Sequence, residues 1–136
     1  MENMDLENIA FSITWQDFET LTSNILKEHD FIVEKNFRFK TKRRYEIDIV
    51  ATKSKKVLCI DCKQWKGGRQ KKSGLLKAVK DQEERTKQLV KHTNSKSQHH
   101  PMIVTLMQED IIKENNTFIV PVWKLNTFLL EFENYI

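Results

Sequence analysis

The sequence RYEIDIVATKSKKVLCIDCKQ, residues 44–64, contains two apolar runs separated by the polar segment 52–56. This pattern predicts two strands joined by a short turn. Because successive strand side chains point to opposite faces, Asp61 and Lys63 share one face of the second strand. Glu46, Asp48 and Val50 likewise share a face of the first strand. The opposite face of both strands is expected to be core, and consists of Ile47, Ile49, Ala51, Leu58, Ile60 and Cys62.

Three charged residues interrupt the apolar pattern of these strands: Asp48, Asp61 and Lys63. A buried charge is costly unless it is paired or bound to a metal. One interpretation is a site for a hard divalent cation, with two carboxylates as ligands and a lysine that orients or deprotonates the attacking water. The other interpretation is a solvated hairpin with one Asp–Lys ion pair. Spacing alone does not decide between them.

Length and composition predict a single domain covering residues 1–136. Hydrophobic residues make up 39% of the chain and charged residues 31%, as in globular proteins. No apolar run is long enough to span a membrane, and the acidic N-terminus lacks the basic start of a signal peptide. A cytoplasmic location is therefore expected by default.

The net charge of +4 is unevenly distributed along the chain. Residues 35–96 contain 20 Lys and Arg against 6 Asp and Glu, whereas the remaining residues contain 3 against 13. A basic middle segment suits a polyanionic partner, because lysine and arginine gain free energy by releasing counterions from phosphates. An ordinary solvated surface is the alternative.

Cys59 and Cys62 form a C-x-x-C pair, but we expect neither zinc nor redox chemistry from it. Residues three apart on a strand point to opposite faces. A zinc site would also need a turn between the thiols and a second pair of ligands at matching spacing. Cys62 is therefore interpreted as a small core residue, whereas Cys59 lies on the face of Asp61.

Before the hairpin, a helix is expected from its N-cap Thr14 to about residue 30, followed by a strand over 31–40 and a basic connection over 40–44. The apolar stripe of this helix is formed by Trp15, Phe18, Leu21, Thr22, Ile25 and Leu26. Glu19 lies beside the stripe, where it is either a solvated carboxylate or a side chain that reaches toward Asp48.

After the hairpin, a basic loop with two glycines covers residues 65–72, and Ser73 is expected to cap a helix over 74–92. Gln82 interrupts the inner stripe of that helix, as a tolerated polar residue or as a side chain aimed at the site or at nucleic acid. A polar loop over 93–100, strands over 102–107 and 117–122, and a helix over 123–132 follow. The expected order is α-β-β-β-α-β-β-α, an α/β domain with a mixed sheet.

These residues, in this order, resemble the PD-(D/E)xK nuclease superfamily, which has the restriction-endonuclease-like fold. The resemblance depends on Glu19 in the first helix, Asp48 within EIDIVA, and the triplet Asp61-Cys62-Lys63. It covers about residues 14–107 and is closest to archaeal Holliday-junction resolvases and Mrr-type endonucleases. The chain departs from the pattern in having Asp61 where close relatives usually have Glu, and in lacking a proline before Asp48.

The resemblance implies a restriction-endonuclease-like core, with helices flanking a mixed central sheet. It also implies that Asp48 and Asp61 bind Mg²⁺ or Mn²⁺, with the backbone carbonyl of Cys62 and with Glu19 directly or through water. Lys63 would position or activate the attacking water, so the implied catalytic set is Glu19, Asp48, Asp61 and Lys63. We expect DNA to contact a basic set supplemented by one glutamine: Lys42, Arg43, Arg44, Lys66, Arg69, Lys71, Lys72 and Gln82.

The predicted function is therefore a metal-dependent endonuclease that hydrolyses DNA phosphodiester bonds. Resolution of four-way junctions is one structure-specific form of this activity, and it requires a homodimer. The alternatives are a non-catalytic nucleic-acid-binding module on the same fold and an interaction protein with a charged hairpin. The first would be expected to lack Asp48, Asp61 or Lys63, and the second leaves the basic middle segment unexplained.

Overall fold

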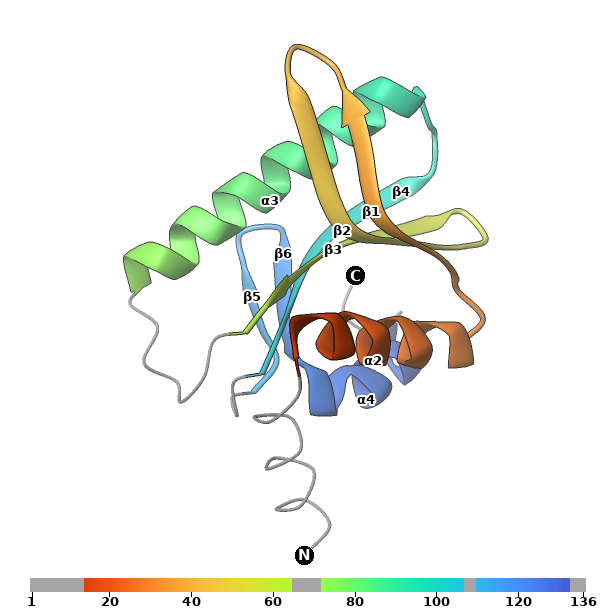
Figure 1. Cartoon of the computed structure of the whole chain (residues 1–136), viewed down its shortest axis with the longest axis vertical. Helices are drawn as coiled ribbons and strands as arrows, with labels where there is room; N and C mark the ends of the chain where they lie inside the picture. The colour runs from red at the N-terminus through yellow and green to blue at the C-terminus, as the bar shows by residue number, and fades with distance from the viewer. Residues whose placement is uncertain (1–13, 65–71, 107–109, 133–136) are drawn as a thin grey trace, which may run out of the picture.

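The computed structural model describes residues 14–64, 72–106 and 110–132, with the side chains of residues 72 and 73 excepted. A mixed sheet of six strands is its central element, in the order β1-β2-β3-β4-β6-β5 (Figure 1). β1, β2 and β3 are antiparallel neighbours, β3, β4 and β6 are parallel, and β5 returns antiparallel to β6. The elements are α2 (Trp15–Glu28), β1 (Ile32–Lys40), β2 (Arg44–Lys53), β3 (Lys56–Lys63), α3 (Lys72–Thr93), β4 (Gln98–Thr105), β5 (Ile112–Glu114), β6 (Thr117–Pro121), the 3-10 turn η1 (Val122–Lys124) and α4 (Leu125–Leu130).

Helices cover both faces of the sheet, which confirms the expected mixed α/β class. α2 and α4 lie together on one face and α3 crosses the other (Figure 1). The α2–α4 side holds the larger core, in which Phe18 and Phe128 are fully buried against Ile60 and Val104. On the α3 side, Val79 packs on Ile103 and Ile119. Within the described residues, no helix is long and apolar enough to cross a membrane.

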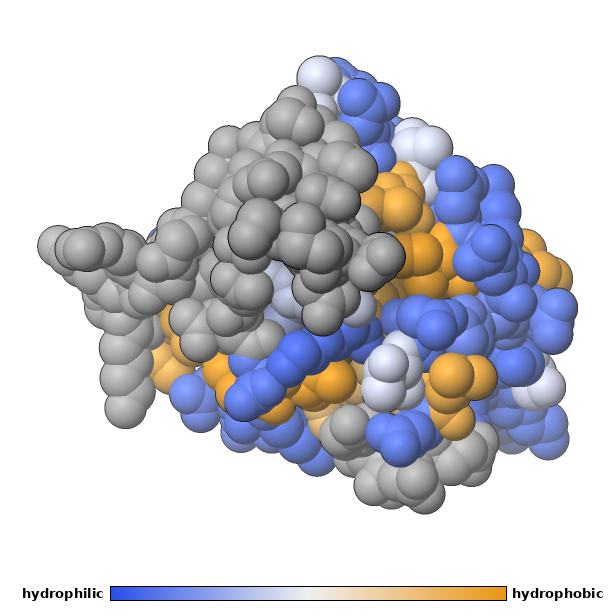
Figure 2. All heavy atoms as spheres, turned by 90° about the horizontal axis from the view of Figure 1, so that it is seen from below, coloured by the Kyte–Doolittle hydropathy of each residue, from blue (hydrophilic) through white to orange (hydrophobic). Residues whose placement is uncertain are grey.

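The face that carries α2 and α4 shows apolar side chains between hydrophilic ones when the molecule is seen from below (Figure 2). Trp15 is 37% exposed and Leu130 is 71% exposed on these helices. The prediction that Trp15 belongs to the buried stripe was therefore wrong, since Trp15 is the first residue of α2 and the buried residues of this helix begin at Phe18. The predicted cap is confirmed, because Thr14 Oγ1 accepts the Asp17 N–H at 3.1 Å.

Several predicted element ends differ from the observed ones. α3 begins at Lys72, so Ser73 lies inside the helix rather than capping it, and Leu76 is exposed. β4 begins at residue 98 instead of 102, with Pro101 in its interior. The proline is tolerated because β6 pairs with β4 only from Met102 onward, so no partner on that side needs the missing N–H.

The hairpin of β2 and β3 is confirmed, but its two faces are both buried. Ile49, Ala51, Leu58, Ile60 and Cys62 form the expected core face under α2 and α4. Ile47 instead packs with Tyr45, Val50 and Cys59 in a cluster that includes Leu89 of α3. The alternation of faces along β2 therefore changes between Ile49 and Ile47. On the neighbouring strand β1, Asn36, with φ of 54°, lies at this point, between the pairs Lys35–Ile49 and Phe37–Ile47.

Candidate active site

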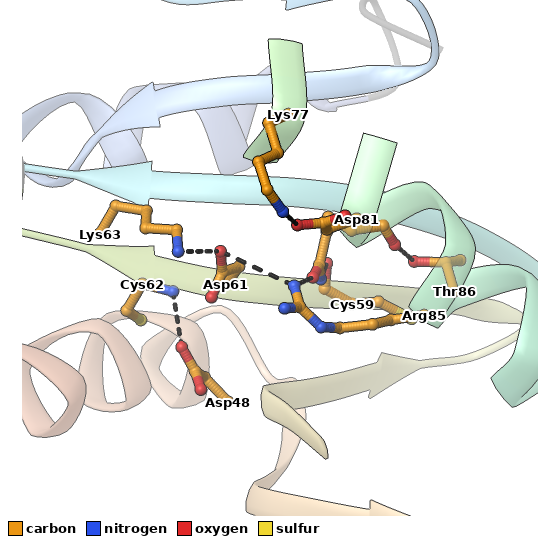
Figure 3. Close-up of polar contacts among 10 residues, drawn as sticks. Asp48, Cys59, Asp61, Cys62, Lys63, Lys77, Asp81, Arg85 and Thr86 are labelled. Atoms are coloured by element: carbon orange, nitrogen blue, oxygen red, sulfur yellow. Dashed lines mark hydrogen bonds and ion pairs between the residues drawn. The ribbon is translucent and has the colours of Figure 1, made fainter. Parts of the chain in front are cut away.

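Asp48 lies where β2 and β3 separate. Their paired residues end at Ile49 and Ile60, so Asp48 is one step beyond the ladder. Its Oδ2 accepts the backbone N–H of Cys62 at 2.9 Å, which replaces the strand-to-strand hydrogen bond expected at this point (Figure 3). The side chain is thereby fixed beside the last residues of β3.

Burial is the main reason why the pKa of Asp48 is raised to about 7. The carboxyl groups of Asp61 and Glu19 raise it further, whereas the hydrogen bond from Cys62 N–H opposes the increase. Two neighbouring carboxylates that cannot easily be ionised together are a common feature of functional sites.

Asp61 and Lys63 share one face of β3, as predicted, and form an ion pair with 3.3 Å between Nζ and Oδ2. Arg85 of α3 approaches the same oxygen, with its Nη1 at 3.9 Å (Figure 3). The Asp61 side chain is only 11% exposed. Within the described part of the chain, this buried oxygen accepts no hydrogen bond, and its contacts there are the ion pairs with Lys63 and Arg85.

Gln82 connects α3 to the same strand. Its Nε2 donates to the carbonyl oxygen of Cys59 at 2.8 Å, and its Oε1 accepts from Arg85 Nη1 at 2.9 Å. The Gln82 side chain is fully buried, so in this conformation it cannot contact a nucleic acid, and that expectation is corrected. Its hydrogen bonds to Cys59 and Arg85 fit the interpretation of Gln82 as a side chain aimed at the site. Arg85 was not singled out from the sequence, although it lies one turn after Gln82.

A cavity of about 490 Å³ opens between the start of β2, the end of β3 and α3. Both acidic and basic side chains line it, and Arg85 and Asp61 lie next to each other in its wall. The lining residues are Arg43, Arg44, Tyr45, Glu46, Asp48, Asp61, Lys77, Asp81, Glu84 and Arg85. Lys77 and Asp81 form an ion pair of 2.8 Å within α3.

A second hollow, of about 680 Å³, continues from this cavity along the hairpin of β1 and β2. The two share Arg44, Tyr45 and Glu46, and the hollow adds Arg38, Phe39 and Lys40. The predicted basic connection therefore lies at the site.

Two further residues of this basic connection make contacts of their own. Lys42 pairs with Glu84 at 3.6 Å, and the Arg43 guanidinium lies 4.4 Å from the Tyr45 ring centre. Lys66, Arg69 and Lys71 lie outside the described residues, as does the side chain of Lys72.

Glu19 is buried in α2 and approaches the site from the opposite helix layer. Burial raises the pKa of its carboxyl, and Lys35 partly offsets this effect. Glu19 is close enough to raise the pKa of Asp48, but it is not among the described residues that line the cavity. Of the predicted site residues, Asp48, Asp61 and Lys63 lie together near the end of β3. Glu19 lies close to Asp48 on the α2 side.

The two cysteines lie in cores on opposite faces of the sheet, as their spacing predicts. Burial raises the pKa of the Cys59 thiol to about 12 and raises that of Cys62 well above its ordinary value, so neither is a ready nucleophile. Within the described residues, no group of three or more His, Cys, Asp and Glu side chains is placed to hold a metal ion.

Magnesium does not require such a group, because it commonly binds one or two carboxylates, water and substrate phosphate. Asp48, Asp61 and the carbonyl of Cys62 offer oxygen ligands of this kind. The buried Asp61 Oδ2, which accepts no hydrogen bond from the described residues, also fits a cation as its partner.

Comparison with known proteins identifies a family whose profile matches most of this chain. The profile of the nuclease-related domain (NERD) matches residues 14–120. An uncharacterised protein of Archaeoglobus fulgidus is 31% identical over 123 residues, which cover 90% of this chain and 94% of that protein. The crystal structure of AF1548, a protein of unknown function, is 21% identical with a TM-score of 0.49, over 81% of this chain and 53% of its own. Protein VC1899 from Vibrio cholerae is 14% identical with a TM-score of 0.45, over 87% of this chain and 32% of its own.

Proposed function

The chain belongs to the nuclease-related domain family, and on this premise we propose that it is a metal-dependent endonuclease that hydrolyses DNA phosphodiester bonds. The proposal is carried by the meeting of Asp48, Asp61 and Lys63 at the end of β3, where the two carboxylates line one cavity. Asp48 and Asp61 come from neighbouring strands, and Lys63 contacts Asp61 directly. Arg43 and Arg44, around the start of β2, line the same cavity and supply positive charge for a phosphodiester substrate.

Mg²⁺ or Mn²⁺ would be held by Asp48, Asp61 and the carbonyl of Cys62, with Glu19 acting through water. When bound, the ion lowers the pKa of a ligated water and offsets charge on the phosphate. Lys63 orients the attacking water from the same strand face as Asp61. The hydrogen bond from Cys62 N–H keeps the Asp48 carboxylate directed at the separation of the two strands.

DNA is proposed to follow the basic connection between β1 and β2. Arg44 lines both the cavity and the adjoining hollow, so a phosphate backbone in the hollow would lead into the site. Action on branched DNA by a homodimer, as in junction resolvases, belongs to the same proposal. A cytoplasmic location is compatible with two free cysteines in the described chain.

The test is cleavage of labelled four-way junction, duplex and single-stranded DNA in Mg²⁺ or Mn²⁺. Wild type is compared with Asp48→Asn, Lys63→Ala and the control Asp81→Asn, which lines the same cavity but pairs with Lys77. Cleavage that needs metal, Asp48 and Lys63 but not Asp81 supports the proposal. No cleavage of any substrate, or equal cleavage by all variants, contradicts it.

A non-catalytic nucleic-acid-binding module is the second candidate. It is favoured by the ion pairs of Asp61 with both Lys63 and Arg85, which balance its charge without a metal. Tight DNA binding by a wild type that cuts no substrate, and equal binding by Asp48→Asn, would select this function instead.

A further inference from the structure

Arg85 occupies an unusual position for a helix arginine. Its Nη1 is 2.9 Å from Gln82 Oε1 and 3.9 Å from Asp61 Oδ2, and its side chain lines the cavity and is 29% exposed. Asp61 therefore has two cationic neighbours, one on its own strand and one on α3 (Figure 3). The proposed catalytic set of Glu19, Asp48, Asp61 and Lys63 does not include Arg85.

The two cations are attached to the site in different ways. Lys63 is two residues from Asp61 on the same strand, so the strand backbone keeps the two side chains side by side on one face. Arg85 is held from α3 through Gln82, which is fully buried and fixed to the Cys59 carbonyl at 2.8 Å. The Asp61 contact of Arg85, at 3.9 Å, is longer than its contact with Gln82. Arg85 can therefore leave Asp61 while its hydrogen bond to Gln82 keeps it at the cavity.

A divalent cation at Asp61 would compete directly with Arg85. Like charges a few ångströms apart repel, and the repulsion is stronger in a partly buried site than in water. A guanidinium displaced from a carboxylate suits a phosphate well, because its planar N–H groups can donate two parallel hydrogen bonds. The scissile strand would enter this same cavity, beside Arg44.

We propose that Arg85 is a phosphate-binding residue that pairs with Asp61 in the metal-free protein and is displaced onto the substrate phosphate when a divalent cation binds. This inference rests on the proposed nuclease function and adds a residue that is outside the carboxylate–lysine set. Gln82 is its positioning residue, because it connects the guanidinium to the backbone of β3.

The test measures Mg²⁺ binding by calorimetry without DNA, and then DNA affinity in Mg²⁺. Arg85→Ala is compared with Lys77→Ala, which removes the same charge from the same cavity but from a side chain paired with Asp81. Arg85→Ala should bind Mg²⁺ about fivefold more tightly than wild type, since it loses a competing cation. It should bind DNA about tenfold more weakly, since it loses a charge-assisted phosphate contact. Lys77→Ala should change both by less than about twofold.

Arg85→Lys separates the charge of this residue from its planar shape. It should keep Mg²⁺ affinity near that of wild type and still lose DNA affinity, and it serves as the test if Arg85→Ala does not fold. Mg²⁺ binding by Arg85→Ala that is equal to or weaker than that of wild type overturns the inference, even if wild type cleaves DNA. If wild type binds no Mg²⁺ and cleaves no DNA, the inference and the proposed function both fail.

Discussion

Replacing Asp48 by asparagine should stabilise the metal-free protein at alkaline pH. The folded chain holds a proton on Asp48 more tightly than the unfolded chain does, because burial and the neighbouring Asp61 raise its pKa to about 7. Above that pH the carboxylate is ionised in the folded chain as well, and its burial destabilises the native state relative to the unfolded chain. Asparagine has the same shape, does not titrate, and can still accept the Cys62 N–H through Oδ1.

The magnitude follows from the difference between the ordinary pKa of 3.8 and the folded value of about 7. At about 1.4 kcal/mol for each pH unit, the ceiling is about 4 kcal/mol. Asp48 is half-buried, so solvent screening reduces the expected effect to about 2 kcal/mol. Because the folded pKa is raised, wild type loses stability as the pH rises from about 4 to about 7. The advantage of Asp48→Asn should grow over this window and then stay constant.

The assay is urea unfolding in the presence of EDTA at about pH 5 and about pH 8.5, analysed as the difference between variant and wild type. Asp81→Asn is the control, because the hydrogen bond from Lys77 lowers the pKa of Asp81 and the sign is reversed. That variant should lose at most about 1 kcal/mol at the higher pH. An Asp48→Asn difference that is the same at both pH values would refute the reasoning.

Three other changes test the path of DNA and the packing. Arg44→Glu should weaken DNA binding about tenfold and lower the salt slope by about 0.9, whereas Lys53→Glu, at the other end of β2, should do neither in the same titration. Glu83→Ala should cost about 2 kcal/mol and speed amide exchange in β5 and β6, because Glu83 accepts hydrogen bonds from the turn at Asn115–Thr117. Phe128→Ala should cost about 4 kcal/mol in urea unfolding, as it empties a fully buried position.

The carboxylate–lysine part of the site could be predicted because it depends on local geometry. A period of two places Asp61 and Lys63 on one face whatever covers the sheet, and the observed ion pair follows from that alone. The closeness of Asp48 to β3 follows from the antiparallel pairing of two adjacent strands, although the change of face between Ile49 and Ile47 does not follow from the alternation. Both features depend on a stretch of only about twenty consecutive residues.

Arg85 could not be singled out because its role depends on how α3 is rotated over β3. The helix has basic residues all along its length, and nothing in their spacing distinguishes the one that meets Asp61. Gln82 stands out in the sequence as a polar residue in an apolar stripe, but its buried hydrogen bond to Cys59 depends on a helix–strand contact that the pattern does not specify. β5 was missed because three residues are too few for a strand pattern, although the Asn115–Asn116 turn was a usable signal.

In the metal-free site the negative charges of the two carboxylates are offset in different ways, and this difference couples metal binding to DNA binding. Burial favours the protonated form of Asp48, whereas Asp61 is balanced by Lys63 and Arg85. A divalent cation that binds Asp61 would free the Arg85 guanidinium for phosphate, so metal and DNA should each raise the affinity for the other. Because such coupling is reciprocal, Mg²⁺ should bind more tightly to the DNA complex than to the free protein, by the same factor by which Mg²⁺ tightens DNA binding. In Arg85→Ala the part of this coupling that passes through the guanidinium is absent, and the factor should fall toward the value set by the metal's own contact with phosphate.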